Sequence, residues 1–192
     1  PGVAKHEQEI VLAPGVEPES DRYLPLRVAA AAAEFELPIS PVTLQNLRRC
    51  PIRDSVWDDE SRQLFVRLLA SGPALMRVWE ELDFVDIPGR WMPEWLGIRN
   101  RPSASAAHRY TIDRHSVEVT SRLARVSAAR GERYDDRHYT ALLLAGLLHD
   151  VGKRPFVTDH AAEGARHAAV IMKRMGFDAD IARWVRILVR EH

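Results

Sequence analysis

From Asp21 onward, apolar residues recur at intervals of three and four, the spacing that places side chains on one face of an α-helix. We therefore predict helices throughout that part of the chain. They cover residues 24–37, a short segment from 41, and residues 58–70, 74–82, 112–129, 137–150, 159–175 and 178 onward. Ser40 followed by Pro41 is a typical helix start, because serine caps free backbone N–H groups and proline fits the first helical position. With no convincing pair of strands after residue 20, the pattern predicts an all-α fold.

Two stretches break the helical pattern. Residues 1–20 hold several prolines around a strand-like run at 9–12, so we interpret them as a linker or the tail of a preceding domain. Residues 85–107 are also rich in proline and predict an irregular connection. Trp91 and Trp95 lie in that connection, and we expect them to pack it onto the core, which is a more frequent role for tryptophan than ligand binding.

Composition narrows the class of protein. The 192 residues suit one domain, or one domain with a smaller helical annex. Lys and Arg number 27, as do Asp and Glu, so the chain lacks the basic excess typical of proteins that bind DNA or RNA. Cys50 is the single cysteine, which excludes an intramolecular disulfide, and no apolar run approaches the roughly 18 residues of a membrane span. We therefore expect a cytoplasmic protein that binds neither nucleic acid nor a membrane.

Both ends of the sequence suggest a piece of a longer polypeptide. The chain begins with Pro1 rather than Met. It ends at His192 inside a helical pattern, with no glycine, asparagine or proline stop signal before that end. We therefore expect further domains, and any function found here is expected to be one of several.

The first candidate for chemistry is His115. It shares a predicted helical face with Val119, Leu123 and Val126, so its imidazole is expected to point inward. A lone inward histidine is more often a hydrogen-bonded core residue than a metal ligand. His115 therefore becomes a candidate ligand only if other ligating groups lie beside it.

His149 and Asp150 are stronger candidates, because they follow a helical segment that is apolar all round. Residues 141–148 carry no polar side chain, which predicts a position at the centre of the fold. An imidazole and a carboxylate placed there are destabilising unless both find partners. A divalent cation is one such partner, since both groups are good ligands. A buried ion pair with an arginine is the alternative.

Past the end of that segment, Gly152 is suited to terminate the helix in a left-handed conformation. Lys153 follows, either to neutralise a phosphate beside a metal or to act as a solvated cation at the helix C-terminus. His160 opens the next predicted helix, and Gly164, one turn later, allows that helix to approach a neighbour closely. For His167, a further turn along, we expect a structural role.

The last predicted helix places His192 on a core face. Ile181, Val185 and Leu188 precede it at helical spacings, and Glu191 lies beside it in the sequence. Four histidines thus fall on predicted core faces or helix ends, at positions 115, 149, 160 and 192. Chance packing explains so many poorly.

In their order and spacing, these residues resemble the HD superfamily of metal-dependent phosphohydrolases. His115, the pair His149-Asp150 and then Lys153 look like its metal-binding pattern. His160, followed by Gly164 and Ala165, is similar to the additional histidine motif of its more metal-rich members. The resemblance implies a helical bundle of the HD-domain type with an N-terminal helical annex.

A closer resemblance covers most of the chain. The stretch from His108 to His115 is similar to the H-x-Y-T-V-D-x-H sequence of the bifunctional PII-protein uridylyltransferase/uridylyl-removing enzymes. Further segments look like other elements of that HD domain or like the actinobacterial branch of the family, namely 142–153, 159–160, 188–192, 26–33, 78–80 and 93–95. The resemblance implies that residues 21–107 are a helical annex and connection, and that residues 108–192 are the hydrolase core.

The resemblance also implies an activity, which is metal-dependent hydrolysis of the UMP or AMP group from the modified PII nitrogen-signalling protein. It implies one or two divalent cations, either Mn, Mg, Fe or Zn, and fusion to nucleotidyltransferase and ACT domains in the full protein. Asp150 and Lys153 are the implied catalytic residues. The implied metal ligands are His115, His149, Asp150, His160, Glu191 and His192.

Two departures, a truncation and two alternatives accompany this hypothesis. One departure is the loop at residues 154–158, which lacks the glycines typical of the family. Glu191 stands where the family usually has histidine, although a carboxylate also binds hard cations. The final aspartate ligand of the pattern is expected beyond His192, so the core is expected to be truncated there, and the activity of the fragment alone stays open. One alternative is a stand-alone HD phosphohydrolase that acts on free nucleotides. The other is a catalytically silent regulatory module, in which a metal only braces the helices.

Overall fold

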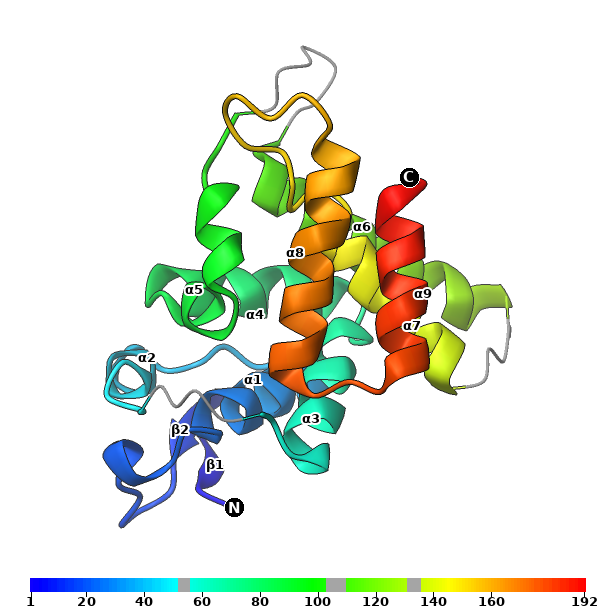
Figure 1. Cartoon of the computed structure of the whole chain (residues 1–192). Helices are drawn as coiled ribbons and strands as arrows, with labels where there is room; N and C mark the ends of the chain where they lie inside the picture. The colour runs from blue at the N-terminus through cyan, green and yellow to red at the C-terminus, as the bar shows by residue number, and fades with distance from the viewer. Residues whose placement is uncertain (52–55, 103–109, 131–135) are drawn as a thin grey trace.

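The computed structural model describes residues 1–51, 56–102, 110–130 and 136–192 (Figure 1). Its α-helices are α1 (Leu24–Glu34), α2 (Pro41–Leu47), α3 (Asp59–Leu69), α4 (Pro73–Phe84), α5 (Ile87–Trp91), α6 (Ile112–Arg130), α7 (Asp136–Leu148), α8 (His160–Met175) and α9 (Ala179–Arg190). Two 3₁₀ turns, η1 (Pro18–Ser20) and η2 (Pro93–Gly97), and two short strands complete the described elements. The prediction of an all-α fold is confirmed.

The predicted helices differ from the observed ones mainly at their ends, where capping residues lie just outside the helix. Ser40 caps α2 by accepting a hydrogen bond from the Thr43 backbone N–H, and Pro41 is the first helical residue, as predicted. Asp58, Asp159 and Asp178 cap α3, α8 and α9 in the same way. Each cap satisfies backbone donors that have no partner inside the helix. Within the described ranges, no helix combines the length and the apolar character needed to cross a membrane.

The first residues form a hairpin that packs against α1. Strand β1 (Val3–His6), which the sequence did not predict, pairs antiparallel with β2 (Glu9–Leu12), the segment predicted as strand-like. Ile10 of β2 is fully buried, and its backbone bonds to the segment that leads into α2. The interpretation of residues 1–20 as a linker or a tail stays a prediction.

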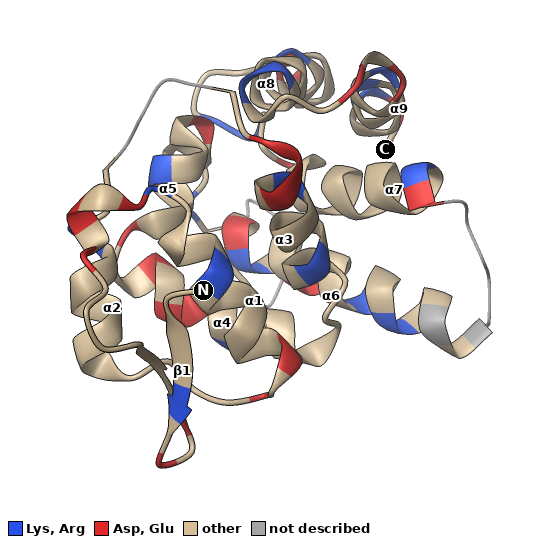
Figure 2. Ribbon diagram, turned by 90° about the horizontal axis from the view of Figure 1, so that it is seen from below, with Lys and Arg blue, Asp and Glu red and all other residues tan. Residues whose placement is uncertain are grey.

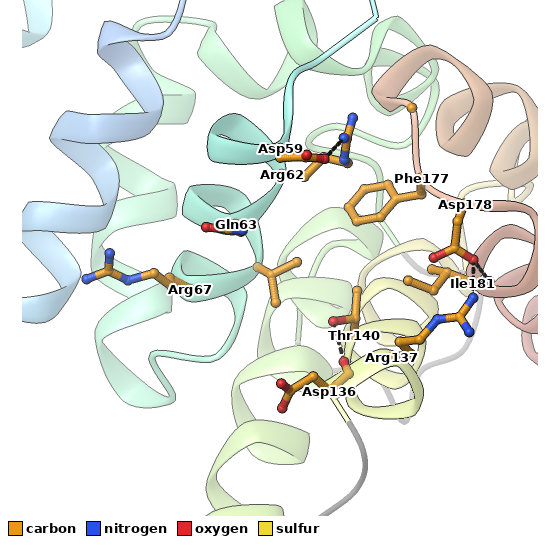
Figure 3. Close-up of a pocket in the computed structure, with 12 residues that line it drawn as sticks. Asp59, Arg62, Gln63, Arg67, Asp136, Arg137, Thr140, Phe177, Asp178 and Ile181 are labelled. Carbon is orange, nitrogen blue, oxygen red and sulfur yellow. Dashed lines mark hydrogen bonds and ion pairs between the residues drawn. The ribbon is translucent and has the colours of Figure 1, made fainter.

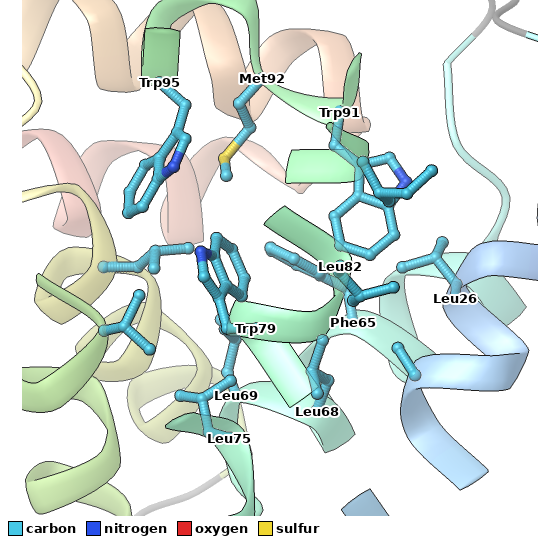
Figure 4. Close-up of a cluster of buried hydrophobic side chains, with 14 of the residues drawn as sticks. Leu26, Phe65, Leu68, Leu69, Leu75, Trp79, Leu82, Trp91, Met92 and Trp95 are labelled. Atoms are coloured by element: carbon cyan, nitrogen blue, oxygen red, sulfur yellow. The ribbon is translucent and has the colours of Figure 1, made fainter. Parts of the chain in front are cut away.

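The connection after α4 is not irregular throughout, because it contains α5 and η2. Prolines at the first positions of both elements set the local backbone, so proline here begins short helices instead of preventing them. Trp91 and Trp95 are buried, which confirms their predicted packing role. Trp95 meets Trp79 edge to face with ring centroids 5.3 Å apart, within the core between the annex and α6 (Figure 4).

The second half of the chain is a helical bundle. Helices α8 and α9 lie side by side and run in opposite directions, and α7 packs against α9 and α6 (Figures 1 and 2). The end of α7, the beginning of α8 and the end of α9 therefore meet at one end of the bundle, which carries the C-terminus in Figure 1.

Two predicted core faces were wrong in part. On α6, Val126 is 43% exposed, while small residues such as Ser116, Thr120 and Ala124 are buried. Gly146 of α7 allows a close approach to this part of α6, because a Cβ there would come within 2.7 Å of a Leu123 side-chain carbon and 3.3 Å of the Thr120 hydroxyl oxygen. Leu123 of the predicted face therefore packs here beside Thr120.

On α9 the buried stripe is Ile181, Val185 and Val189, while Leu188 is 43% exposed. The spacing of four between these residues keeps all of them toward α7 and α8. His192 therefore does not continue the stripe as predicted, because α9 ends at Arg190 and His192 lies beyond it.

Candidate metal centre

A close backbone contact joins the loop after α7 to the first turns of α8. A Cβ on Gly152 would lie 2.8 Å from the Gly164 Cα, and closer still to the His160 carbonyl oxygen and the Gly164 backbone nitrogen. Gly152 is not among the glycines with positive φ, so the predicted left-handed helix end was wrong. Glycine is required for this approach, and Gly164 takes the facing side of it, as predicted for that residue.

Three predicted site residues meet near the end of α7. His115 lies in the first turn of α6, whereas His149 and Asp150 directly follow α7. One potential ligand atom from each residue lies within 4.8 Å of the other two. The rings of His115 and His149 meet edge to face, with centroids 5.3 Å apart. The structure therefore brings together two imidazoles and one carboxylate from two helices.

His149 has a defined orientation and protonation pattern. Its Nδ1 lies 2.8 Å from the Gly146 carbonyl oxygen in the last turn of α7. A carbonyl oxygen only accepts hydrogen bonds, so Nδ1 carries the proton in the neutral ring, and Nε2 presents a lone pair. That Nε2 lies 3.3 Å from the Asp150 Oδ2.

His192 repeats this arrangement at the end of α9. Its Nδ1 lies 2.8 Å from the Val189 carbonyl oxygen, and its Nε2 lies 3.4 Å from the Asp150 Oδ1. Both imidazoles are therefore held by a carbonyl three residues earlier and aim their lone pairs at one carboxylate. Sequence reasoning missed these two carbonyls, although histidine just after a helix C-terminus is a pattern that indicates such a bond.

Asp150 is the centre of the group and is 2% exposed. Its Oδ2 accepts a hydrogen bond from the Lys153 Nζ at 2.8 Å, while its Oδ1 is buried without a hydrogen-bond partner. Burial alone raises the pKa of this carboxyl, but His149 and Lys153 outweigh burial and hold the pKa well below its usual range. Asp150 is therefore a carboxylate at neutral pH, with one oxygen that lacks a donor.

The other candidate residues are placed differently around this group. His160, the exposed first residue of α8, has its ring 5.6 Å from that of His192, which in turn is 5.3 Å from the ring of His149. Lys153 pairs with Asp150 and keeps 31% of its side chain exposed. Glu191 is exposed at the C-cap of α9, outside the three-residue group.

The residues present fit a divalent cation. The Nε2 atoms of His149 and His192 lie 3.3 and 3.4 Å from the Asp150 carboxylate oxygens, so two imidazoles and one carboxylate could ligate a cation at this place. Imidazole nitrogen and carboxylate oxygen are also a donor set that suits Mn, Fe and Zn, and carboxylate suits Mg. The unpartnered Asp150 Oδ1 adds a further free donor atom. The alternative of an ion pair between Asp150 and an arginine does not match the structure, because the cationic side chain that pairs with Asp150 is Lys153.

His167 has the structural role that the sequence predicted. It is buried on α8, with its Nε2 2.9 Å from the Glu163 Oε1. Burial and the nearby Arg154 lower the pKa of this imidazole despite the Glu163 carboxylate.

Glu94 of η2 is a half-buried anchor that sequence reasoning did not identify. Its carboxylate accepts two hydrogen bonds from Arg174 of α8, at 2.7 and 2.8 Å. Its backbone carbonyl accepts one from Arg154 at 2.7 Å, and the Arg154 side chain lies where a Cβ on Gly97 would be. The loop that follows the candidate metal centre is thereby fixed to the annex.

A cavity of about 590 Å³ lies at the opposite end of α7 from this group (Figure 3). Its walls come from α3, the first turn of α7 and the turn between α8 and α9, and Phe177 points into it beside Ile181 (Figure 3). Because α7 spans 13 residues, about 20 Å separate this cavity from the histidines. The cavity is therefore a separate feature of the bundle.

Comparison with known proteins agrees with this geometry. Residues 112–192 match the family described as the HD domain. The whole chain is 38% identical to the bifunctional uridylyltransferase/uridylyl-removing enzyme of Streptomyces coelicolor, and 39% identical to that of Mycobacterium tuberculosis. For the Corynebacterium glutamicum enzyme, identity is 34% over 90% of the chain.

The chain spans only 22% to 24% of the length of these three relatives. Residues 103–109, which include His108 and Arg109 of the motif noted above, lie outside the described residues. The matched region nevertheless contains the candidate metal centre, from His115 to His192. Residues 112–192 therefore match the HD domain family, and the chain as a whole is similar to a part of the bifunctional uridylyltransferase/uridylyl-removing enzymes, actinobacterial ones included.

Proposed function

We propose that this chain is a metal-dependent phosphodiester hydrolase that removes a nucleotidyl group, UMP or AMP, from the modified PII signalling protein. The observation that carries the proposal is the group of His115, His149 and Asp150, with ligand atoms within 4.8 Å, in a segment that matches the HD domain family. The relatives are named for uridylyl removal, which supplies the reaction class. The full polypeptide is proposed to be cytoplasmic and to carry nucleotidyltransferase and ACT domains as well.

One or two divalent cations, with Mn, Mg, Fe and Zn as candidates, are proposed to bind at this group. His115, His149 and Asp150 are the proposed ligands, and His160, Glu191 and His192 are proposed to complete the set. When bound, a divalent cation supplies Lewis acidity toward phosphoryl oxygens and makes water more acidic. The Gly146 and Val189 carbonyls hold two of the imidazoles with Nε2 ready to ligate.

Asp150 and Lys153 are the proposed catalytic residues. Because the pKa of Asp150 is held low, its carboxylate is a weak base, and its free Oδ1 is suited to accept a hydrogen bond from the attacking water and orient it. The Lys153 side chain is 31% exposed, and its ammonium donates to the other carboxylate oxygen, Oδ2. It is suited to stabilise the negative charge that develops on the phosphate.

The test measures UMP or AMP released from nucleotidylated PII by the polypeptide that contains this sequence, with and without added Mn²⁺. We expect His149→Ala and Asp150→Ala to lower the rate by about 100-fold or more, because loss of a residue that only supports a metal ligand already lowers activity by about 10–100-fold. The matched control is His138→Ala, since His138 lies at the other end of the same helix and stacks on Trp184. This variant should retain the full rate.

The alternatives predict different results in the same assay. Hydrolysis of free mononucleotides without release from PII would replace the proposed substrate with a nucleotide. A bound metal without turnover on either substrate would indicate a silent regulatory module. Unchanged hydrolysis in both His149→Ala and Asp150→Ala would remove the candidate metal centre from the mechanism altogether.

A further inference from the structure

The loop between α7 and α8 is closed at its base, so its middle stays near the candidate metal centre. A Cβ on Gly152 would overlap the His160 carbonyl oxygen, which means that residues 153–159 leave and return to nearly the same point. Phe156 is the middle residue of this loop. Its Cα lies at most about 11 Å from that of Lys153 and about 14 Å from that of His160, since a chain spans at most about 3.6 Å per residue.

The tip of the loop is a type II turn with phenylalanine in the position that favours glycine. The Val157 backbone N–H donates to the Arg154 carbonyl oxygen at 3.4 Å, which closes the turn. Pro155 holds φ negative at the second position, and Phe156 follows with a φ of +64°. A left-handed backbone is uncommon for any residue with a Cβ and is strained for a bulky one. The conformation of Phe156 therefore destabilises the fold.

The side chain of Phe156 adds no packing that offsets this strain. It is fully exposed, more so than any other large apolar side chain in the described ranges. Six described residues other than glycine have a positive φ, and Phe156 is the only apolar one among them. The turn is also held from outside, because the Arg154 side chain donates to the Glu94 carbonyl oxygen at 2.7 Å. A strained, exposed ring on a fixed loop is typical of a residue that serves binding.

The position of the loop narrows what this ring binds. In the proposed reaction, Lys153 meets the phosphate of the nucleotidyl group, and one ribose joins that phosphate to the base. The base is therefore the part of the substrate that lies one sugar away from Lys153, on the scale of the distance from Lys153 to Phe156. Aromatic side chains stack on the flat faces of unpaired bases in many proteins that bind them.

We propose that Phe156 binds the substrate by stacking on the base of the nucleotidyl group. This inference rests on the proposed function, because it uses the same phosphate at Lys153. Every base has a π face, so Phe156 adds affinity for the nucleotide without selecting between UMP and AMP. The strain at Phe156 then has a reason, because a glycine in the same turn would relieve the backbone but would lack the ring.

Phe156→Asn tests the inference in the Mn²⁺-loaded polypeptide that contains this sequence. Asparagine tolerates a left-handed backbone, so the variant should keep or raise the Tm, whereas a ring that packs on the fold would lower it when removed. For release from nucleotidylated PII, KM should rise roughly 5- to 150-fold with kcat little changed, the range for loss of one base–aromatic stack. Inhibition of release by added UMP or AMP should weaken by the same factor. Inhibition by ribose 5-phosphate, which has no base, should not change.

Two matched variants complete the test. Phe156→Tyr keeps the ring and should behave like the unaltered protein. Phe84→Asn removes another exposed phenylalanine, at the end of α4, and should also leave KM and inhibition unchanged. The inference alone is overturned if UMP and AMP inhibit Phe156→Asn as well as they inhibit the unaltered protein, even where KM rises, because the ring would then contact PII instead of the base. No release by the unaltered protein overturns the proposed function and this inference with it.

Discussion

The contact between Gly152 and the first turns of α8 allows a sharp test of how the candidate metal centre is assembled. In Gly152→Ala, the new Cβ would lie 2.8 Å from the Gly164 Cα and closer to two further backbone atoms of α8. None of these atoms belongs to a side chain that rotates away. Relief therefore requires α8 to move as a whole, together with His160 at its beginning.

The expected magnitude follows from the kind of atom that is crowded. Overpacking a well-ordered core costs about 1–3 kcal/mol when side chains absorb it. Because the crowded atoms here are all backbone, we expect the upper end of that range, about 3 kcal/mol of unfolding free energy. For a domain of this size, that loss corresponds to a fall in Tm of roughly 6–12 °C.

Gly164→Ala is the matched control, because it places the same methyl group on the other side of the same contact. Its Cβ would meet a Val189 side-chain carbon at 3.1 Å, with the nearest backbone atoms at 3.5 and 3.6 Å. This crowding is mild, and replacing glycine by alanine within a helix stabilises it by about 1 kcal/mol. The two effects nearly cancel, so we expect a net change close to zero.

Urea denaturation, followed by far-ultraviolet circular dichroism, measures both variants, and calorimetric titration with Mn²⁺ measures the site. Gly152→Ala should also lose metal affinity, because its displaced helix carries His160. The reasoning fails if Gly152→Ala is destabilised by less than about 1 kcal/mol, or if Gly164→Ala is the less stable of the two.

Two further predictions concern the annex and its attachment. Glu94→Gln should destabilise the fold near neutral pH and make its stability less sensitive to acid. Hydrogen bonds from Arg174 hold the pKa of Glu94 below its usual range despite burial, so the stabilisation is present above about pH 4.3 and is lost as pH falls through the lower folded pKa. Denaturation at several pH values measures this effect, and a parallel loss of stability in the two proteins would contradict it. Phe65→Ala should lower the unfolding free energy by about 3–5 kcal/mol, because the ring is fully buried among Trp57, Trp79 and Trp91, and a loss below about 1 kcal/mol in urea denaturation would contradict that packing.

The helices were predictable because their signals are local. A serine or aspartate cap, a proline at the first turn and apolar residues at intervals of three and four all lie within one segment, as at Ser40 and Asp58. The proximity of His149 to Asp150 needed only their adjacency. The proximity of this pair to His115 depends on the packing of α6 against α7. The sequence indicated that proximity only through the family resemblance.

The errors came from contacts between distant segments. Periodicity on α6 favoured the face of Val119 and Val126, but the face with Ser116 and Thr120 is the one buried by the neighbouring helices. Gly152 has the composition of a helix terminator, and its actual role is visible only once α8 lies against it. The pairing of Glu94 with Arg174, 80 residues apart, has no signal in a single sequence.

The arrangement of helix ends explains why this corner of the bundle suits a cation. The C-termini of α7 and α9 both converge on Asp150, and a helix C-terminus carries partial negative charge from carbonyls without partners. At each end a carbonyl fixes the Nδ1 proton of a histidine, so the remaining lone pairs point toward the same carboxylate. The helix C-termini, the imidazole lone pairs and the buried carboxylate thus all favour a cation at this place. Among the neighbouring groups, only Lys153 is shown to donate to Asp150 as a permanent cation. One lysine leaves the Asp150 Oδ1 without a donor, and the proposed divalent cation would be the partner that balances the whole group.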